Sequence, residues 1–173
     1  QGGFDVIIGN PPYGADLSEE DKKYFSFSTK LSDYQLDTYI LFIEKVLKEL
    51  LRNDGILGFI IPNTWLTNIK SKLFREYISK NTKILNIVNY SKRVFASATV
   101  DSVTLIVEKS IPGEENNINI SLVDSGNNPV YQIHQLKQLE WIKGSVFNIF
   151  VNDSEKKMIR KIENSSKMLD DIC

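Results

Sequence analysis

The first third of the chain alternates apolar runs with polar and amphipathic segments. Residues 4–9 are a short, nearly continuous apolar run, which is typical of a strand buried on both faces of a parallel sheet. Residues 14–36 have a polar, mixed-charge composition that predicts a long loop, and such loops are more often functional than idle. After a turn at residues 53–55, residues 56–61 form a second buried strand, which Pro62 stops. With the helix between them, these strands predict a βαβ unit with a right-handed crossover.

The helix of this unit is predicted from Thr38 to about Arg52, with Asp37 as its N-cap. Its apolar residues recur at the i, i+3, i+4 and i+7 spacing of an amphipathic helix. Glu44 and Lys48 are one turn apart on the opposite face, where we expect them to form an ion pair.

A second helix is predicted over residues 69–80. The side chains that we expect it to bury are Leu73, Phe74, Tyr77 and Ile78. Residues 84–90 and 100–108 are further apolar strands, close enough in sequence to pair in antiparallel orientation. The predicted fold class is therefore α/β, with a mainly parallel sheet and one antiparallel strand.

The composition changes after Pro112, where turn clusters surround short alternating segments. This pattern predicts a small β-rich extension over residues 113–152. A short amphipathic helix is expected from Asp153 to about Asn164. Its apolar face would be formed by Met158, Ile159 and Ile162. We therefore divide the chain into residues 1–112, 113–152 and 153–173.

Charge is distributed unevenly along a chain whose net charge is −1. The segment from Trp65 to Arg93 carries a net charge of +6, so the remainder carries −7. Its basic residues are Lys70, Lys72, Arg75, Lys80, Lys83, Lys92 and Arg93. A local basic stripe on an acidic protein favours a polyanionic partner. A solvated helix face is the commoner meaning of such a run when it is taken alone.

The chain has one cysteine, Cys173, and one histidine, His134. A disulfide within the chain and a Cys/His zinc site are therefore excluded, and we expect no metal site. No apolar run approaches the roughly 20 residues that span a bilayer. These features favour a cytoplasmic protein without membrane contact, and we expect no catalytic role for His134.

The tetrapeptide Asn10-Pro11-Pro12-Tyr13 directly follows the first predicted strand, and ligands of α/β sheets bind at the carboxyl ends of strands. The Asn10 side-chain oxygen and the Pro11 carbonyl can accept hydrogen bonds from an exocyclic amine and turn its lone pair outward. Pro12 restricts Pro11 to extended conformations, and Tyr13 offers a flat face to a base. The alternative for the bare tripeptide is an ordinary turn after a strand.

The segment Phe4-Asp5-Val6-Ile7-Ile8-Gly9-Asn10-Pro11-Pro12-Tyr13 resembles the catalytic motif of N6-adenine DNA methyltransferases of restriction-modification systems, in the TaqI-like and type IIG arrangement. The resemblance continues in order to about residue 110. It includes Asp37-Thr38-Tyr39, residues 55–62, Asn63-Thr64-Trp65-Leu66, Phe74-Arg75-Glu76, Val94-Phe95 and residues 100–109.

The resemblance implies that the chain is the C-terminal half of a Rossmann-like, S-adenosylmethionine-dependent methyltransferase sheet. Asn10, Pro11, Pro12 and Tyr13 would be catalytic, and Tyr13 and Phe95 would stack on an adenine flipped out of double-stranded DNA. Candidate contacts with the DNA backbone are Lys70, Lys72, Arg75, Lys92 and Arg93. Trp65 is expected either in the core or at the substrate.

The chain departs from the family because the glycine-containing cofactor loop is missing, and no Gly-x-Gly occurs in it. Residues 169–172 resemble the lead-in to a target-recognition domain. We therefore expect a fragment that is inactive alone and does not bind S-adenosylmethionine, with no cofactor-binding residue identified. In this family the strand at residues 4–9 has a second partner strand. We expect the chain to self-associate through that edge, or to cover it with its C-terminal helix.

Two other functions fit the same residues. The first is a methyltransferase acting on a protein glutamine or an RNA base, which uses a similar tetrapeptide. The second is a non-catalytic specificity or scaffold fragment. The sequence beyond Pro112 argues against the first, and the intact Asn10-Pro11-Pro12-Tyr13 argues against the second.

Overall fold

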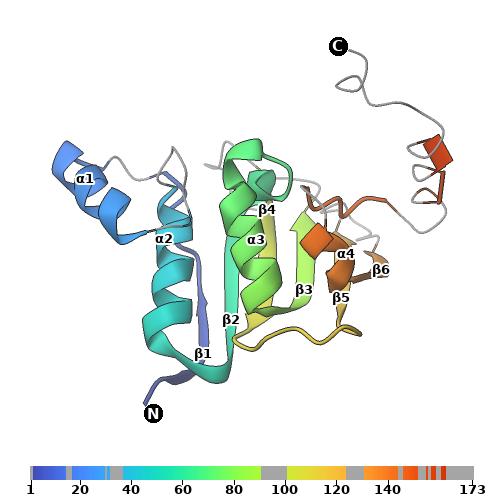
Figure 1. The fold of residues 1–173 in the computed structure, drawn as a ribbon, viewed down its shortest axis with the longest axis horizontal. Helices are drawn as coiled ribbons and strands as arrows, with labels where there is room; N and C mark the ends of the chain where they lie inside the picture. The colour runs from blue at the N-terminus through green and yellow to red at the C-terminus, as the bar shows by residue number, and fades with distance from the viewer. Residues whose placement is uncertain are drawn as a thin grey trace.

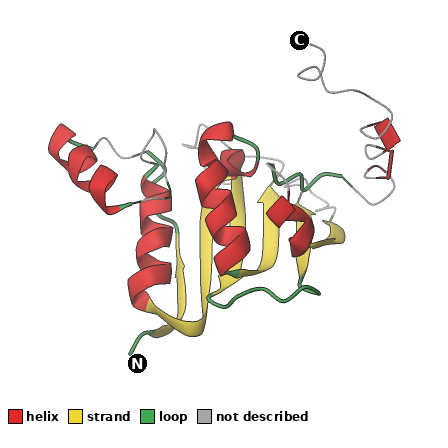
Figure 2. Ribbon diagram, viewed as in Figure 1, coloured by secondary structure: helices red, strands yellow, loops and turns green. Residues whose placement is uncertain are grey.

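The computed structural model describes residues 2–14, 17–29, 31, 37–90, 101–123, 131–143 and 146–151, with residues 155, 157, 158, 161 and 162. These residues form one six-stranded sheet in the order β1-β2-β4-β3-β5-β6, with helices packed on one of its faces (Figure 1, Figure 2). The strands are β1 (Phe4–Gly9), β2 (Leu51–Pro62), β3 (Lys83–Tyr90), β4 (Ser102–Glu108), β5 (Asn117–Val123) and β6 (Tyr131–Lys137). The helices are α1 (Glu19–Ser28), α2 (Thr38–Lys45), α3 (Lys72–Asn81) and α4 (Gln138–Lys143).

The α/β fold predicted for the first part of the chain is confirmed. β1 and β2 are parallel, and β4 runs antiparallel between β2 and β3. The expected antiparallel pair of β3 and β4 is therefore present. β5 then lies parallel to β3, and β6 is antiparallel to β5, so the two strands after Pro112 extend the same sheet.

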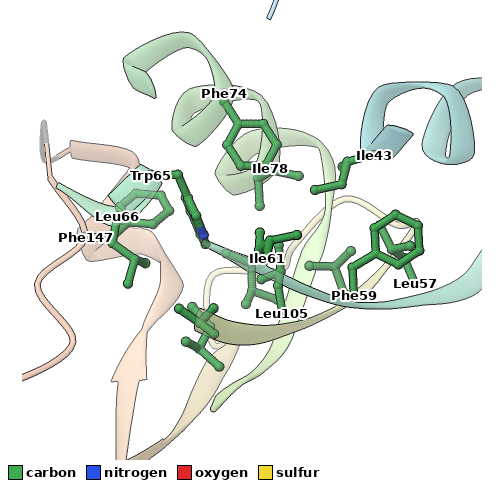
Figure 3. Close-up of a cluster of buried hydrophobic side chains, with 14 of the residues drawn as sticks. Ile43, Leu57, Phe59, Ile61, Trp65, Leu66, Phe74, Ile78, Leu105 and Phe147 are labelled. Atoms are coloured by element: carbon green, nitrogen blue, oxygen red, sulfur yellow. The ribbon is translucent and has the colours of Figure 1, made fainter. Parts of the chain in front are cut away.

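The core lies between the sheet and the helices that cover one face (Figure 3). Leu57 and Ile61 of β2, Leu105 of β4 and Ile78 of α3 have no exposed surface. Because each buried aliphatic side chain contributes about 1.5–3 kcal/mol, this layer supplies most of the hydrophobic stabilisation.

The prediction that β1 is buried on both faces is wrong for the described residues. Phe4, Val6 and Ile8 are 60%, 55% and 80% exposed. Within the described part of the chain, β1 pairs with β2 alone. Because Ile7 packs against the core and side chains alternate along a strand, Phe4, Val6 and Ile8 lie on the opposite face. The apolar composition of β1 is therefore not matched by apolar contacts on that face.

The prediction of a loop over residues 14–36 is also wrong, because α1 lies within it. Ser18 caps this helix by accepting a hydrogen bond from the Asp21 amide at 3.1 Å, and its hydroxyl donates to the Asp21 carboxylate at 2.6 Å. Acidic residues in the first turn favour a helix N-terminus. This helix was missed because its sequence is polar with only weak periodicity, although Ser18 and Asp21 have the spacing of a cap.

The helix predicted from Thr38 is present but ends earlier than Arg52. α2 continues as a turn of π-helix over Val46–Leu50, and β2 begins at Leu51. Asp54 adopts a left-handed conformation with φ 59°, and an added Cβ at Gly55 would lie 2.9 Å from the Arg52 carbonyl oxygen. The predicted tight turn at residues 53–55 is therefore present. It lies within β2, where the pairing register between β1 and β2 shifts.

The remaining helices agree with the sequence in part. The second predicted helix begins with a 3-10 turn at Ile69–Ser71 and continues as α3. Of its four predicted core residues, Phe74 and Ile78 are fully buried and Leu73 and Tyr77 are half-buried. The predicted ion pair of Glu44 and Lys48 forms, but Glu44 is buried rather than on a solvated face because it also accepts a hydrogen bond from the Thr29 hydroxyl after α1.

Near the C-terminus, Met158 and Ile162 are 65% and 57% exposed. The described part of the segment 155–162, drawn in orange-red, lies far from β1 (Figure 1). The expectation that this segment covers the β1 edge is therefore wrong for its described residues. Ile159 lies outside the described residues.

Candidate functional site

The carboxyl ends of the parallel strands β1, β2 and β3 meet at one edge of the sheet, the upper edge in Figure 1. The tetrapeptide Asn10-Pro11-Pro12-Tyr13, called the NPPY loop below, follows β1 at this edge. Asn63 follows β2 at the same edge. Ligands of α/β sheets bind in the crevice outside the carboxyl ends of the strands. The topology therefore places both the NPPY loop and Asn63 at the edge where a ligand would bind.

The NPPY loop is attached to two different elements. The Thr38 hydroxyl, at the start of α2, donates to the Pro12 carbonyl oxygen at 2.6 Å. The Tyr13 hydroxyl donates to the Ile60 carbonyl oxygen of β2 at 3.3 Å. These two contacts hold the second half of the loop between helix and sheet.

The first half of the loop has a different environment. Pro11 is buried, whereas Asn10 is exposed. Among the described residues, neither the Asn10 side chain nor the Pro11 carbonyl forms a hydrogen bond with another group. The arrangement can therefore present two acceptors to a ligand at the sheet edge, while the Pro12 carbonyl is already engaged.

Tyr13 is half-buried beside β2 and β4. Burial raises the pKa of its hydroxyl, and the neighbouring Ser102 hydroxyl partly opposes this rise. The phenol is therefore neutral at physiological pH and acts as the donor to Ile60. Its ring offers a surface for stacking.

A second group of polar side chains joins the ends of neighbouring strands. The Asn63 amide nitrogen donates to the Asn89 side-chain oxygen of β3 at 3.3 Å, and the Asn63 backbone N–H donates to the Asp101 carbonyl at 2.9 Å. Asn89 is buried. Asn89 was not predicted as part of the site, although an asparagine within an apolar strand is a signal for such a role because buried amides need partners.

The N-terminus of α2 brings charged residues to this edge. Asp37 precedes α2 without capping it through its side chain. Burial raises the pKa of the Asp37 carboxyl, and the positive charge of Lys70 partly opposes this rise. Lys70 therefore lies close enough to the start of α2 to interact with it electrostatically.

The basic residues expected to contact DNA fall into three groups. Lys70 and Lys72 are exposed. Arg75 is only 3% exposed, and its guanidinium donates to the carbonyls of Trp65 at 2.7 Å and Asn68 at 2.6 Å. These bonds occupy Arg75 within the protein, which argues against a contact with phosphate. Lys92 and Arg93 lie outside the described residues.

Trp65 and Phe95 are the other two aromatic residues that the sequence suggested for contact with the substrate. Trp65 is fully buried and makes edge-to-face contacts with Phe74 and Phe147, with ring centroids 5.3 and 5.6 Å apart (Figure 3). It is therefore a core residue. Phe95, expected to stack on the base, lies outside the described residues.

An apolar cleft of about 370 Å³ opens between α1 and α2 and reaches the NPPY loop at Pro12. Its apolar lining includes Pro12, Leu17, Tyr24, Phe25, Leu41 and Phe42. The other lining residues are polar or charged: Thr29, Thr38, Glu44, Lys45, Lys48 and Glu49. The cleft can therefore accept an apolar part of a ligand beside polar side chains. The cleft reaches the NPPY loop at Pro12, and neither Asn10 nor Pro11 is among its lining residues.

A metal-binding cluster and a membrane-spanning helix are both absent from the described residues. No cluster of His, Cys, Asp or Glu side chains there could hold a metal ion. None of the described helices combines the length and apolar character needed to cross a bilayer.

Comparison with known proteins identifies the family of this arrangement. Residues 1–95 match the model of the family described as Eco57I restriction-modification methylase. The match includes β1, the NPPY loop, α2, β2 and α3.

Individual relatives are similar over most of the chain. The type II restriction enzyme and methyltransferase RM.Eco57I of Escherichia coli is 31% identical over 127 residues, which are 70% of this chain and 12% of that protein. A putative type II restriction enzyme and methyltransferase of Methanocaldococcus jannaschii, RM.MjaORFECS2P, is 35% identical over 66% of this chain and 9% of that protein. The chain thus spans only about a tenth of the length of these relatives.

The fold is also similar to solved structures. The crystal structure of the type IIG restriction endonuclease BpuSI superposes with a TM-score of 0.65 at 20% identity, covering 92% of this chain and 22% of that one. A likeness at this level of identity describes the fold, which is α/β and Rossmann-like.

Proposed function

Because the chain belongs to the Eco57I restriction-modification methylase family, we propose that its NPPY loop is the catalytic loop of a site-specific DNA adenine-N6 methyltransferase. The observation that carries this proposal is the loop itself. At the ligand-binding edge of the sheet it leaves the Asn10 side chain and the Pro11 carbonyl available, while Pro12 and Tyr13 are held by other elements.

The two acceptors suit a weak nucleophile. The lone pair of the adenine 6-amino group is delocalised into the ring, so the free amine attacks poorly. Hydrogen bonds from its two N–H groups to the Asn10 oxygen and the Pro11 carbonyl draw the nitrogen toward tetrahedral geometry. When bound, S-adenosylmethionine would supply the methyl group, whose bond to sulfur would break as its bond to N6 formed. The proton displaced from N6 then passes to solvent, and no covalent enzyme intermediate is needed.

The substrate must reach this loop from within a duplex. Adenine in double-stranded DNA is inaccessible, so the base has to be flipped out at a few kcal/mol of unstacking. The Tyr13 ring is assigned to one face of the flipped base and Phe95 to the other, which offsets part of that energy. Lys70 and Lys72, both exposed, and Lys92 and Arg93 are the proposed contacts with phosphates.

S-adenosylmethionine fits this chain only in part. The apolar cleft beside Pro12 suits a planar group, but the chain contains no Gly-x-Gly sequence of the kind that approaches a cofactor closely. We therefore propose that residues 1–173 in isolation bind S-adenosylmethionine weakly and do not methylate DNA. Low-micromolar binding to residues 1–173 in a calorimetric titration would contradict this.

The test of the catalytic assignment is Asn10→Ala in the full-length protein that contains these residues. Removing one of two acceptors should reduce adenine methylation by roughly 10²-fold or more, as for other lost transition-state hydrogen bonds. DNA binding should persist because phosphate contacts supply most of the affinity. Asn53→Ala, at an exposed asparagine near the start of β2, is the matched control and should leave the rate unchanged. Methylation by Asn10→Ala at the parental rate would show that the assigned role is wrong.

A further inference from the structure

The NPPY loop is unusual in how few groups it offers for attachment. Pro11 and Pro12 have no backbone N–H, so the loop can be held only through its carbonyls, its side chains and its two ends. One of these carbonyls, that of Pro12, accepts the Thr38 hydroxyl at 2.6 Å. The Thr38 contact is therefore one of the few polar restraints on a segment whose geometry matters for catalysis.

Thr38 itself is well fixed. It is 4% exposed and is the first residue of α2, which is anchored in the core by Tyr39, Ile40 and Ile43, all nearly or fully buried. The Tyr39 ring also packs edge-to-face on Phe74 with centroids 6.3 Å apart. A β-branched side chain on such a helix has few rotamers available, so its hydroxyl is a stable reference point for the loop.

The contact determines the orientation of the neighbouring peptide. The ring of Pro12 already fixes its φ angle, and holding the Pro12 carbonyl fixes its ψ angle as well. The peptide between Pro11 and Pro12 is then restrained from both sides, with Tyr13 attached to Ile60 beyond it. The direction of the Pro11 carbonyl depends on these restraints.

We propose that Thr38 is a positioning residue of the methyl-transfer reaction. Its hydroxyl engages the Pro12 carbonyl and thereby aims the Pro11 carbonyl at the substrate amine. This inference rests on the proposed function of the NPPY loop. It assigns a catalytic consequence to a side chain that contacts neither substrate nor cofactor.

The experiment compares Thr38→Val and Thr38→Ser in the full-length protein, with an oligonucleotide duplex as substrate. Valine keeps the shape and removes the hydroxyl, and a misplaced acceptor should reduce kcat roughly 10- to 100-fold. The KM for the duplex should stay within about twofold, because phosphate contacts are untouched. Serine keeps the hydroxyl and should restore kcat to near the parental value.

Thr82→Val is the matched control. The Thr82 hydroxyl makes the same kind of bond, to the Ile78 carbonyl at 2.7 Å, and Thr82 is 1% exposed, but it lies at the end of α3 away from the NPPY loop. This variant should lose a similar amount of thermal stability while its kcat is unchanged. An equal loss of kcat in Thr82→Val would overturn the proposal by showing that stability alone is responsible.

Two further results decide the matter. An unchanged kcat in Thr38→Val, or an equal loss in Thr38→Ser, would show that the hydroxyl does not act as proposed. If Thr38→Val does not fold, Thr38→Ala against Thr38→Ser makes the same comparison without added bulk, and equal rates would overturn the proposal. Asn10→Ala in the same assay distinguishes a failure of the proposed loop function from a failure of the proposed role of Thr38. A parental rate there rejects the function of the loop, whereas a slow Asn10→Ala with a normal Thr38→Val rejects only the role of Thr38.

Discussion

The two faces of the sheet carry similar residue types but have different surroundings. On β2, Leu57 and Ile61 face the helices and are fully buried, while Ile56 and Ile60 face the other way and are half-buried. On β1 the contrast is larger, because Ile7 packs against the core and Ile8 is 80% exposed. Figure 2 shows the helices on one face of the sheet.

The apolar sequence of a strand therefore does not by itself show that both faces of that strand are covered by other residues. A continuous apolar run predicts cover on both faces, and β1 and β2 have that pattern. Within the described residues, however, most of the hydrophobic stabilisation comes from the face that the helices cover. Substitutions at neighbouring positions of the same strand should therefore have very different effects.

The largest expected effect is at Ile61. Ile61→Ala should lower the free energy of unfolding by about 2–5 kcal/mol, because it removes fully buried methyl groups and leaves a cavity. Ile60→Ala, the next residue on the opposite face, should lower it by about 1 kcal/mol or less. Urea denaturation of residues 1–173 measures both values. Equal losses would mean that the two faces are covered alike in solution, and the comparison would fail.

Much of the fold and part of the site follow from local sequence patterns. The strands at residues 56–61 and 84–90 were predictable from apolar composition. The NPPY loop could be singled out because its residues supply the hydrogen-bond acceptors and the aromatic ring that the proposed reaction needs. What could not be predicted depends on contacts between distant residues. The Thr38 hydroxyl and the Pro12 carbonyl are 26 positions apart, and nothing local to either indicates the bond.

Gln138 illustrates the same limit. It is fully buried, accepts from the Ile84 amide at 2.8 Å, and donates to the carbonyls of Ser79 and Thr82 at 2.8 and 2.7 Å. It thus joins α4 to the end of α3 and the start of β3. A glutamine in a polar segment gives no sign of such a role, since these three partners lie 54 to 59 positions away.

An intermediate effect on stability is expected at the buried Arg75, compared with the exposed Lys72. Arg75→Lys should cost about 1–3 kcal/mol, because a lysine cannot reproduce the guanidinium bonds to the Trp65 and Asn68 carbonyls and leaves buried acceptors unpaired. Lys72→Gln, at an exposed position nearby, should leave stability within about 0.5 kcal/mol.

DNA binding should show the opposite order. In the full-length protein, Lys72→Gln should weaken binding and reduce the salt dependence of the affinity by about one counterion, whereas Arg75→Lys should change neither in its folded form. Thermal denaturation and fluorescence titration at several salt concentrations make the two measurements. A reduced salt slope for Arg75→Lys would return Arg75 to the set of phosphate contacts.

The smallest effect on stability is expected on the exposed face of β1. Ile8→Lys replaces a side chain that is 80% exposed, so the free energy of unfolding should change by less than about 0.5 kcal/mol. Its effect on association should be large, because an apolar edge strand favours pairing with another chain and a charged lysine on the exposed face of that strand opposes it. We expect residues 1–173 to form dimers or larger species through β1, and Ile8→Lys to shift them toward monomer in light scattering over a range of concentrations. Ile111→Lys, at an isoleucine that is 74% exposed after β4, is the matched control and should leave association unchanged. If unmodified residues 1–173 are monomeric at all concentrations, or if both lysine variants dissociate the species equally, β1 is not the associating surface.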